Sequence, residues 1–444
     1  MVYGWSRVMD GRVVIYDYDQ GMMVWRDLPN PSIQMLEQDF AHYRKAGVLG
    51  VDTESRGAIG TTFLNLHCRA QLLWDPSRKV KDMLAEFYPA FYGPAAGPMA
   101  AYWSAILNAW TTTLVTEHEH FVIPAIYTPE LISTLRRHLQ DAEAAMASRR
   151  RDAAPSDRDR KFLERLDFTR HSFAIIEAYA AMVAAAATRG DYAEAVRFGE
   201  QGLAAREALT AMNNTFTTYQ RRHPKPGAGP GGMPEEGPAW WPGEVQQYRD
   251  LQTLVDGTRG RLVARLPLDW AFRRDPAGRG RDDGWGLLAP DLAYWHRQGA
   301  TMTPEARKDH PPDQWEMVRT DLYLQAQGVR SPDSQSYSGD GWYTTEMELS
   351  ADQVDAPIRL MFPGLFNECR LYVDGREVAH RAGYKPLWWH NDYRFEWDVD
   401  LTGRLHPGRQ RITLLLRIPN HFGGLFRRPF LYSPVTDAGK PAPG

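Results

Sequence analysis

Two short apolar runs near the N-terminus of this 444-residue chain each end in a pair of carboxylates. Asp17 and Asp19 follow the first run, and Asp52 and Glu54 follow the second. If each strand continues through its pair, the spacing of two places both side chains on one face. Two carboxyl groups that approach a common pocket are what hydrolysis of a glycosidic bond requires. We therefore take Glu54, Asp17 and Asp52 as the candidate catalytic residues.

Aromatic and polar residues around these acids could bind a sugar ring. Flat aromatic faces stack on sugars, and an arginine near a carboxylate can lower its pKa while an apolar wall raises that of another. A second aromatic pair lies far along the chain, where packing against a core or a neighbouring domain is an equal alternative. The candidate substrate-binding residues are Tyr16, Tyr18, Asp19, Trp25, Arg56, Trp388 and Trp389.

A purely structural role is the alternative for all of these acids. Carboxylates after strands often cap helices or pair with basic residues, and Asp17 and Asp19 could simply end their strand. Essential carboxylates could also lie on strands that residues 1–444 do not include. The sequence leaves both alternatives open.

The sequence does not predict a metal or cofactor site. Glu117-His118-Glu119-His120 lacks the spacing that places two histidines on one helical face, so we expect a solvated helix end there. There is no phosphate loop, dinucleotide fingerprint or nucleophile elbow. Cys68 and Cys369 fall in a helical and a strand pattern respectively, where we expect buried, unpaired thiols.

Composition narrows the classes of partner. The 52 basic and 55 acidic residues give a net charge of −3, and no basic face interleaved with aromatics indicates nucleic acid. No apolar run suggests a membrane span. No signal peptide is recognisable, so the compartment stays unknown, with a secreted or periplasmic location as the alternative for a full-length form. The oligomeric state is also unknown. The 15 Trp, 20 Tyr and 17 Phe suit an oligo- or polysaccharide partner, although large cores use aromatics too.

The first 61 residues predict one strand–helix–strand unit. Residues 13–18 and 48–52 are short apolar runs typical of buried strands, and a helix between Ser32 and Ala46 stops at Gly47. Such a unit implies a parallel sheet. One unit cannot cover its own sheet edges, and a full barrel needs about 250 residues. We therefore expect residues 1–61 to be the truncated, terminal part of a TIM-like barrel; a partner chain or a misassigned start codon are the alternatives.

The rest of the chain predicts a multidomain α+β protein. Apolar residues at helical spacing indicate an α-helical bundle, and a Pro- and Gly-rich stretch after it indicates a linker with one short helix. Strict alternation towards the C-terminus, with a hairpin turn at Asp374-Gly375, predicts an antiparallel β-sandwich. The expected ranges are 62–215 for the helical domain, 216–281 for the linker and 282–444 for the sandwich.

The front of the chain contains a series of motifs: Ile15-Tyr16-Asp17-Tyr18, Leu28-Pro29-Asn30-Pro31, Tyr43-Arg44-Lys45-Ala46-Gly47-Val48, Leu64-Asn65-Leu66, Leu72-Leu73-Trp74-Asp75-Pro76, and Glu86-Phe87 with Phe91-Tyr92-Gly93-Pro94-Ala95-Ala96. By these motifs, residues 1 to about 140 resemble the bacterial family called domain of unknown function 4838. That family is itself similar to α-glucuronidases and β-hexosaminidases with a TIM-like barrel.

The C-terminal region contains a second set of motifs, which includes Gly341-Trp342-Tyr343, Leu371-Tyr372-Val373-Asp374-Gly375-Arg376 and Gly423-Gly424-Leu425-Phe426-Arg427. By these motifs, residues 342–431 resemble the sugar-binding jelly roll of glycoside hydrolase family two, a relative of galactose-binding domains. That module mainly braces the catalytic barrel in its family. Together the two resemblances imply a glycoside-hydrolase-like protein of polysaccharide breakdown, inactive if the truncated barrel is all there is. A non-catalytic carbohydrate-binding or scaffold protein is the alternative.

Overall fold

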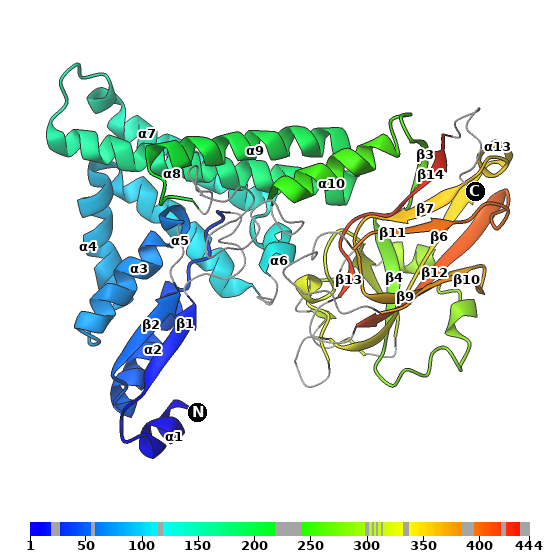
Figure 1. Cartoon of the computed structure of the whole chain (residues 1–444), viewed down its shortest axis with the longest axis horizontal. Helices are drawn as coiled ribbons and strands as arrows, with labels where there is room; N and C mark the ends of the chain where they lie inside the picture. Colours follow the sequence, from blue (N-terminus) through cyan, green and yellow to red (C-terminus); the bar gives the residue numbers. More distant parts are fainter. Residues whose placement is uncertain are drawn as a thin grey trace, which may run out of the picture. The chain divides into compact units, whose positions relative to one another are not determined.

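The computed structural model of the chain comprises two compact units (Figure 1). Unit 1 contains Met1–Thr113, Ile126–Ala180 and Glu200–Glu236; unit 2 contains Leu114–Ala125, Ala181–Gly199 and Gly237–Gly444. The side chains of residues 18, 54, 119–122 and 295–297 are not described. The described residues are 1–18, 27–54, 58–113, 119–217, 241–297, 302–303, 306–307, 310–311, 314–331, 337–383, 395–418 and 423–435.

Unit 1 contains the predicted strand–helix–strand unit. Strands β1 (Val14–Tyr18) and β2 (Gly50–Glu54) pair in parallel, from Val14 opposite Gly50 to Tyr18 opposite Glu54. The helix between them, α2 (Ile33–Ala46), ends where Gly47 adopts the left-handed conformation at φ 71°. The parallel pairing and the helix stop are thus confirmed, although β2 begins two residues later than predicted.

Helices make up the rest of unit 1, and their aromatic side chains form its core. The Phe63 ring lies 5.5 Å from Phe91, 5.2 Å from Trp103 and 5.7 Å from Phe168, so one phenylalanine joins four helices. The apolar residues at helical spacing, from which the helices were predicted, are therefore the ones that pack in this core. The other helices of unit 1 are α1 (Val2–Val8), α3 (Ile59–Trp74), α4 (Val80–Tyr92), a 3₁₀ turn (Gly93–Ala95), α5 (Ala96–Thr112) and α7 (Pro129–Arg150).

A long helical hairpin continues from unit 1 into unit 2. Helix α8 (Asp157–Val183) runs into a π-helical turn (Ala184–Arg189), and α9 (Tyr192–Met212) follows after Gly190. Residues 157–189 are long and apolar enough to cross a membrane, which differs from the expectation that no run would be. However, 56% of its most apolar 18-residue segment is buried inside the protein, and a helix in a protein core can be equally long and apolar.

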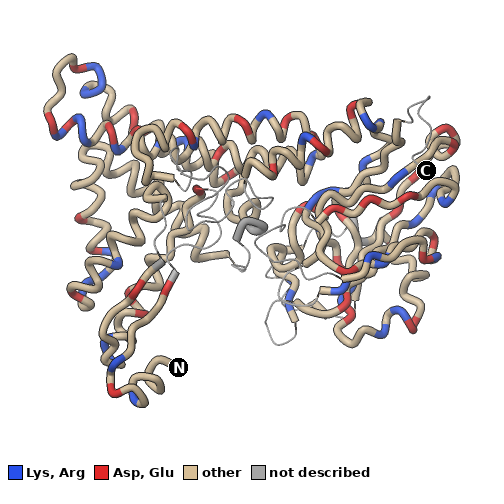
Figure 2. Tube along the Cα trace, viewed as in Figure 1, with Lys and Arg blue, Asp and Glu red and all other residues tan. Residues whose placement is uncertain are grey.

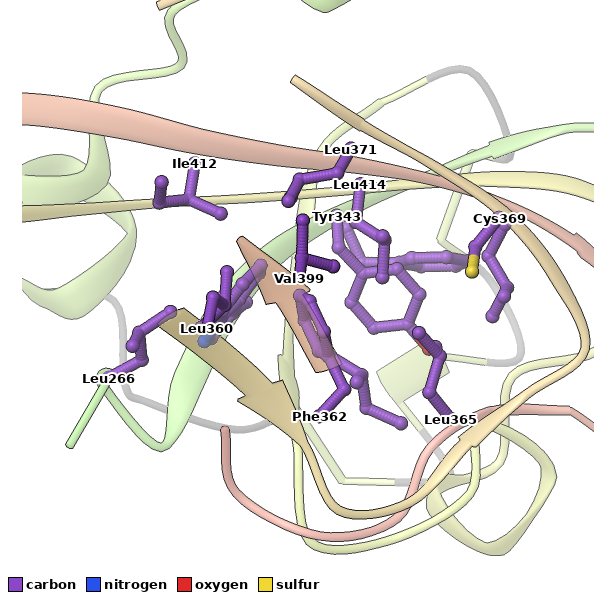
Figure 3. Packing of buried hydrophobic residues seen from close by; sticks show 14 of the residues in the cluster. Leu266, Tyr343, Leu360, Phe362, Leu365, Cys369, Leu371, Val399, Ile412 and Leu414 are labelled. Carbon is purple, nitrogen blue, oxygen red and sulfur yellow. The ribbon is translucent and has the colours of Figure 1, made fainter. Parts of the chain in front are cut away.

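Unit 2 contains two larger antiparallel sheets that share one apolar core. The strand order is β10-β9-β12-β6-β4-β5 in the six-stranded sheet and β11-β7-β14-β3 in the four-stranded sheet. Leu371 and Leu414 of one sheet and Leu360 and Val399 of the other belong to the same buried cluster (Figure 3). The alternating residues that predicted strands in this region therefore do form the facing inner surfaces.

The strands of unit 2 are β3 (Gly260–Arg265), β4 (Asp269–Asp275), β5 (Glu316–Arg319), β6 (Gly339–Leu349), β7 (Arg359–Phe362), β8 (Leu365–Phe366), β9 (Glu368–Val373), β10 (Arg376–Arg381), β11 (Trp397–Asp400), β12 (Gly408–Ile418), β13 (Gly424–Leu425) and β14 (Phe430–Pro434). Short β8 and β13 pair with each other. The helices of unit 2 are α6 (Glu119–Ile126), α10 (Trp241–Thr253), α11 (Leu292–Arg297), α13 (Ala351–Val354) and two 3₁₀ turns (Trp285–Leu287 and Gln325–Gln327).

Two strands lie where the sequence predicted a linker. Both β3 and β4 fall within residues 216–281, yet β3 pairs with β14 and β4 pairs with β5 and β6. The sequence does not show the alternation typical of a strand here, because the buried positions at the end of β4 are polar. Arg274 and Asp275 are only 4% and 3% exposed. The short helix predicted within the linker is α10.

Candidate functional site

The register of β1 against β2 divides the predicted catalytic acids between two faces. Tyr16 lies opposite Asp52, and Asp17 lies opposite Thr53. Because partners in a parallel pair share a face and successive residues alternate, Asp17 and Asp52 point to opposite sides of this sheet. The two strands do not bring these two carboxylates together in one pocket.

The Asp17 face is turned towards helices α2 and α3. Asp17 pairs with Arg69 of α3, whose Nη2 lies 3.0 Å from Asp17 Oδ2. The Arg69 side chain is only 4% exposed, whereas that of Asp17 is 35% exposed. The helix thus presents a buried guanidinium to a half-buried carboxylate, and this pair ties β1 to α3.

Helix α2 adds two further titratable groups to the same face. Burial raises the pKa of the Asp39 carboxyl, and the negative charge of Asp17 raises it further. The pKa of Tyr43 is also raised, first by burial and then by the charges of Asp39 and Asp17. Arg69 opposes both effects because its positive charge favours the ionised forms.

The opposite face of the sheet is open among the described residues. Val14 and Tyr16 are each 58% exposed, and Asp52 is exposed beside them. Tyr18 and Glu54 end the two strands in register with each other, but their side chains lie outside the described part. This face therefore carries an exposed tyrosine opposite an exposed carboxylate.

Other predicted site residues cannot be placed. Asp19, Trp25, Arg56, Trp388 and Trp389 all lie outside the described residues. The Glu117-to-His120 motif lies outside them as well, except for the backbone of its last two residues at the start of α6. Among the side chains that the structure does describe, no group of three His, Cys, Asp or Glu could hold a metal ion.

A buried loop before α2 fixes where that helix starts. Asp27 and Arg206 form an ion pair at 2.5 Å, with side chains 1% and 3% exposed. Tyr127 donates its hydroxyl to the Pro29 carbonyl at 2.7 Å. Asn65 donates to the Asn30 carbonyl at 3.2 Å and also accepts a backbone hydrogen bond from the helix cap. The Leu-Pro-Asn-Pro motif thus holds the backbone that leads into α2.

Sequence reasoning missed two buried polar residues of α3: Arg69 pairs with Asp17, and Asn65 holds the loop before α2. Asn65 and Arg69 are one turn apart on α3 and are 1% and 3% exposed, so both polar groups lie on the buried face of their helix. A polar pair at a spacing of four on an otherwise apolar helical stripe was the available signal. Because buried polar groups need partners, such a pair indicates hydrogen-bonding groups on a neighbouring segment.

One family model matches the front of the chain. Residues 1–105 match the model of a domain of unknown function, DUF4838. This agrees with the resemblance stated for residues 1 to about 140 and covers its larger part. A comparison with curated proteins finds no match.

Solved structures of glycoside hydrolases show a weaker likeness. A β-glucuronidase from Ruminococcus gnavus in complex with a C6-substituted uronic isofagomine is 15% identical, covers 40% of this chain and 29% of its own length, and has a TM-score of 0.30. A β-glucuronidase from an uncultured Clostridium sp. is 14% identical, with 40% and 30% covered and a TM-score of 0.30. The chain thus spans less than a third of these proteins, and TM-scores this low do not indicate a shared overall fold.

Proposed function

We propose that this protein hydrolyses a glycosidic bond of an oligo- or polysaccharide at the open face of β1 and β2. The supporting observation is the parallel pair itself, with helices on the Asp17 side and an exposed Tyr16 and Asp52 on the other. Parallel sheets are normally covered on both faces, so an open face that carries aromatic and acidic residues suits either a ligand or further protein. The match of residues 1–105 to DUF4838 is compatible with this proposal and does not define an activity.

The proposed barrel explains why half of the strand surface is open. In a TIM-like barrel, strand residues alternate between the helical layer and the interior, and chemistry occurs at the carboxyl ends of the strands. Asp17 with Arg69 is in contact with the helical layer, whereas Tyr16 and Asp52 are on the other face. We infer that residues 1–61 form the end of such a barrel and that its other strands are not among the strands described here.

Within this proposal, the acids on β2 are the stronger catalytic candidates. Asp52 is exposed on the open face, and Glu54 is two residues further towards the carboxyl end of the same strand. One of them would act as acid or base, with a second carboxyl group about 5 Å away in a retaining mechanism or roughly 6.5–9.5 Å away in an inverting one. Tyr16 and Tyr18 would stack on the sugar. Asp17, already paired with Arg69, would position β1 rather than contact the substrate.

The experiment compares matched carboxylate variants of the protein expressed with any strands encoded upstream of Met1. Glu54→Gln and Asp52→Asn are assayed on a panel of aryl glycosides of neutral sugars and uronic acids. Glu164→Gln on α8 is the control, since Glu164 is an exposed carboxylate in unit 1. We expect at least one β2 variant to lower kcat/KM by about 10³-fold or more while the control leaves it unchanged, because loss of an essential acid or base removes transition-state stabilisation.

Two results would contradict the hydrolase proposal. One is unchanged turnover in both β2 variants on a substrate that the unmodified protein cleaves. The other is the lack of any open reading frame or partner chain that supplies further strand–helix units. In the second case residues 1–61 could not be the end of a barrel.

A non-catalytic carbohydrate-binding or scaffold protein is the second candidate function. The observation that favours it lies in unit 2, where a polar hollow of about 300 Å³ opens on the six-stranded sheet. The two sheets would then be a jelly roll of the galactose-binding kind, serving recognition rather than catalysis. Calorimetry of the 444-residue chain against oligosaccharides tests this, with binding in the absence of any hydrolysis as the expected result.

A further inference from the structure

A hollow of about 300 Å³ lies on the outer face of the six-stranded sheet of unit 2. Its volume is at the small end of the range for ligand pockets, which is about 300–1,000 Å³. Strands β6, β9 and β12 form its floor, and the loop that follows β4 supplies Gly278, Arg281 and Asp282 at its side. The hollow therefore sits on a rigid sheet surface and has one loop wall.

The floor consists of two rows of residues that are adjacent across the strands. In the first row, Glu368 of β9 lies opposite Arg417 of β12, which lies opposite Asp340 of β6. Arg417 pairs with Asp340 at 3.0 Å. Glu368 accepts no hydrogen bond among the described residues, and His380 Nε2 lies 3.7 Å from Glu368 Oε1. The Glu368 carboxylate, 32% exposed, therefore has acceptor capacity for a ligand.

The second row supplies one apolar side chain, Leu415, beside the charged row. Leu415 of β12 lies opposite Arg370 on one side and Trp342 on the other. Leu415 packs with Trp342 and Tyr372 in a small buried cluster of the outer face, and only 7% of its surface is exposed. The hollow thus has an aliphatic side chain in its floor next to two arginines, of which Arg370 pairs with Glu377 at 2.6 Å and Arg417 pairs with Asp340.

The charges around the hollow balance. Its described lining contains three arginines, Arg281, Arg370 and Arg417, and three carboxylates, Asp282, Asp340 and Glu368. This local balance resembles the chain as a whole, where acidic and basic residues are interspersed along both units (Figure 2). A balanced lining gives no net attraction for an anion or a cation, yet it offers many donors and acceptors.

We propose that this hollow binds one ring of a neutral sugar, with Leu415 against the C–H face of the ring and Glu368, Arg370 and Arg417 on its hydroxyls. A sugar ring has an apolar face and a hydroxylated edge, which match the two rows. This site rests on the carbohydrate class of the proposed function but not on catalysis, because it lies in unit 2 and uses none of the β2 acids.

The test uses the full chain and two readouts. Methyl β-D-glucoside, methyl β-D-xyloside and cellobiose are titrated by calorimetry and by NMR of the Leu415 methyl groups, with glucuronate and glycine as charged probes. Glu368→Gln removes the free carboxylate without changing its size, and Glu346→Gln on the same face of β6 is the matched control, since Glu346 is outside the lining. We expect a neutral sugar to shift the Leu415 methyls, and Glu368→Gln, but not Glu346→Gln, to weaken binding tenfold or more.

Three results would overturn the proposal. Failure of every neutral sugar to shift Leu415 removes the site, and equal affinity in Glu368→Gln and Glu346→Gln removes the role of Glu368. Glucuronate or glycine binding more than tenfold tighter than any neutral sugar would overturn the ligand class. Binding that persists in Glu54→Gln while turnover is lost would show that the two sites are separate, so failure of one proposal is distinguishable from failure of the other.

Discussion

Arg69 and Asp17 form an ion pair at 3.0 Å although 52 residues separate them in the sequence. The pair joins the end of β1 to the middle of α3, and it does so on the face of the sheet away from Asp52. A carboxylate that the sequence offered as catalytic is therefore already bound by a buried arginine. We therefore propose that Asp17 positions β1, and we expect the stability of β1 to depend on one side chain of α3.

Replacing Arg69 by methionine should destabilise unit 1. The variant leaves Asp17 without its buried counter-ion and next to Asp39, whose pKa is already raised. Breaking a fully buried pair costs about 3–5 kcal/mol, and because Asp17 is partly exposed we expect roughly 1–3 kcal/mol here. Urea unfolding measures the loss, with Arg7→Met as the exposed control and Arg69→Lys as a variant that keeps the charge. Equal stability of Arg69→Met and Arg7→Met would contradict the positioning role.

The raised pKa of Asp39 predicts a pH dependence of stability. Burial, and then the charge of Asp17, makes the folded state hold this proton more tightly than the unfolded chain does. The free energy of unfolding therefore falls as pH rises above the ordinary aspartate pKa of about 4, because the folded protein must then lose that proton. Asp39→Asn removes this penalty, so its gain over the unmodified protein should be larger at pH 7 than at pH 3.5. Urea midpoints at the two pH values measure the gain, and a gain that is the same at both would refute the assignment.

Gly93 should be irreplaceable where Gly97, four residues later, is not. Gly93 has φ 56°, and a Cβ there would lie 2.4 Å from the Phe162 ring, whereas a Cβ on Gly97 meets nothing within 4 Å. We expect Gly93→Ala to cost about 2–4 kcal/mol through left-handed strain and overpacking. Gly97→Ala should cost nothing and could gain up to about 1 kcal/mol, since alanine favours a helix. Thermal unfolding of the two variants makes the comparison, and a tolerated alanine at 93 would mean that Phe162 can move away.

The sequence predicted the elements of this fold better than their contacts. Helices such as α2 and α5 and strands such as β6 and β12 carry regular apolar periods, and those periods depend only on neighbouring residues. The faces of β1 and β2 could not be assigned in this way, because a spacing of two within one strand says nothing of the register with the next. That register is what separates Asp17 from Asp52.

Buried charges account for the strands and partners that the sequence did not predict. Arg274 at the end of β4 lies 3.2 Å from Glu316, which also pairs with Arg307, and all three side chains are at most 5% exposed. Hydropathy assigns such residues to the surface, so the sequence predicts a linker where β4 lies. Arg69 on α3 is a second example. It lies on the buried face of its helix, where hydropathy predicts an apolar residue, because it has a hydrogen-bonding partner there.

The hairpin turn between β9 and β10 offers a test in which the turn is kept while one charge is removed. Asp374 and Gly375 adopt φ 47° and 80°, and asparagine also tolerates such a turn. Asp374 Oδ1 accepts the Arg411 amide at 2.8 Å, and Oδ2 lies 3.0 Å from His406 Nε2. The pKa of His406 is raised, first by its bond to the Pro407 carbonyl and then by Asp374.

Asp374→Asn should therefore lower the pKa of His406 towards its ordinary value of about 6.5 while the Pro407 bond keeps part of the increase. Because a raised histidine pKa stabilises the folded state below about pH 6.5 and that gain is lost as pH rises through the folded pKa, the variant should lose more stability at pH 5.5 than at pH 8.5. An NMR titration of the His406 ring, assigned with His406→Gln, measures the shift. An unchanged His406 pKa in Asp374→Asn would mean that the carboxylate and imidazole do not interact in solution, and the hairpin would then be held by the Arg411 amide and the glycine turn alone.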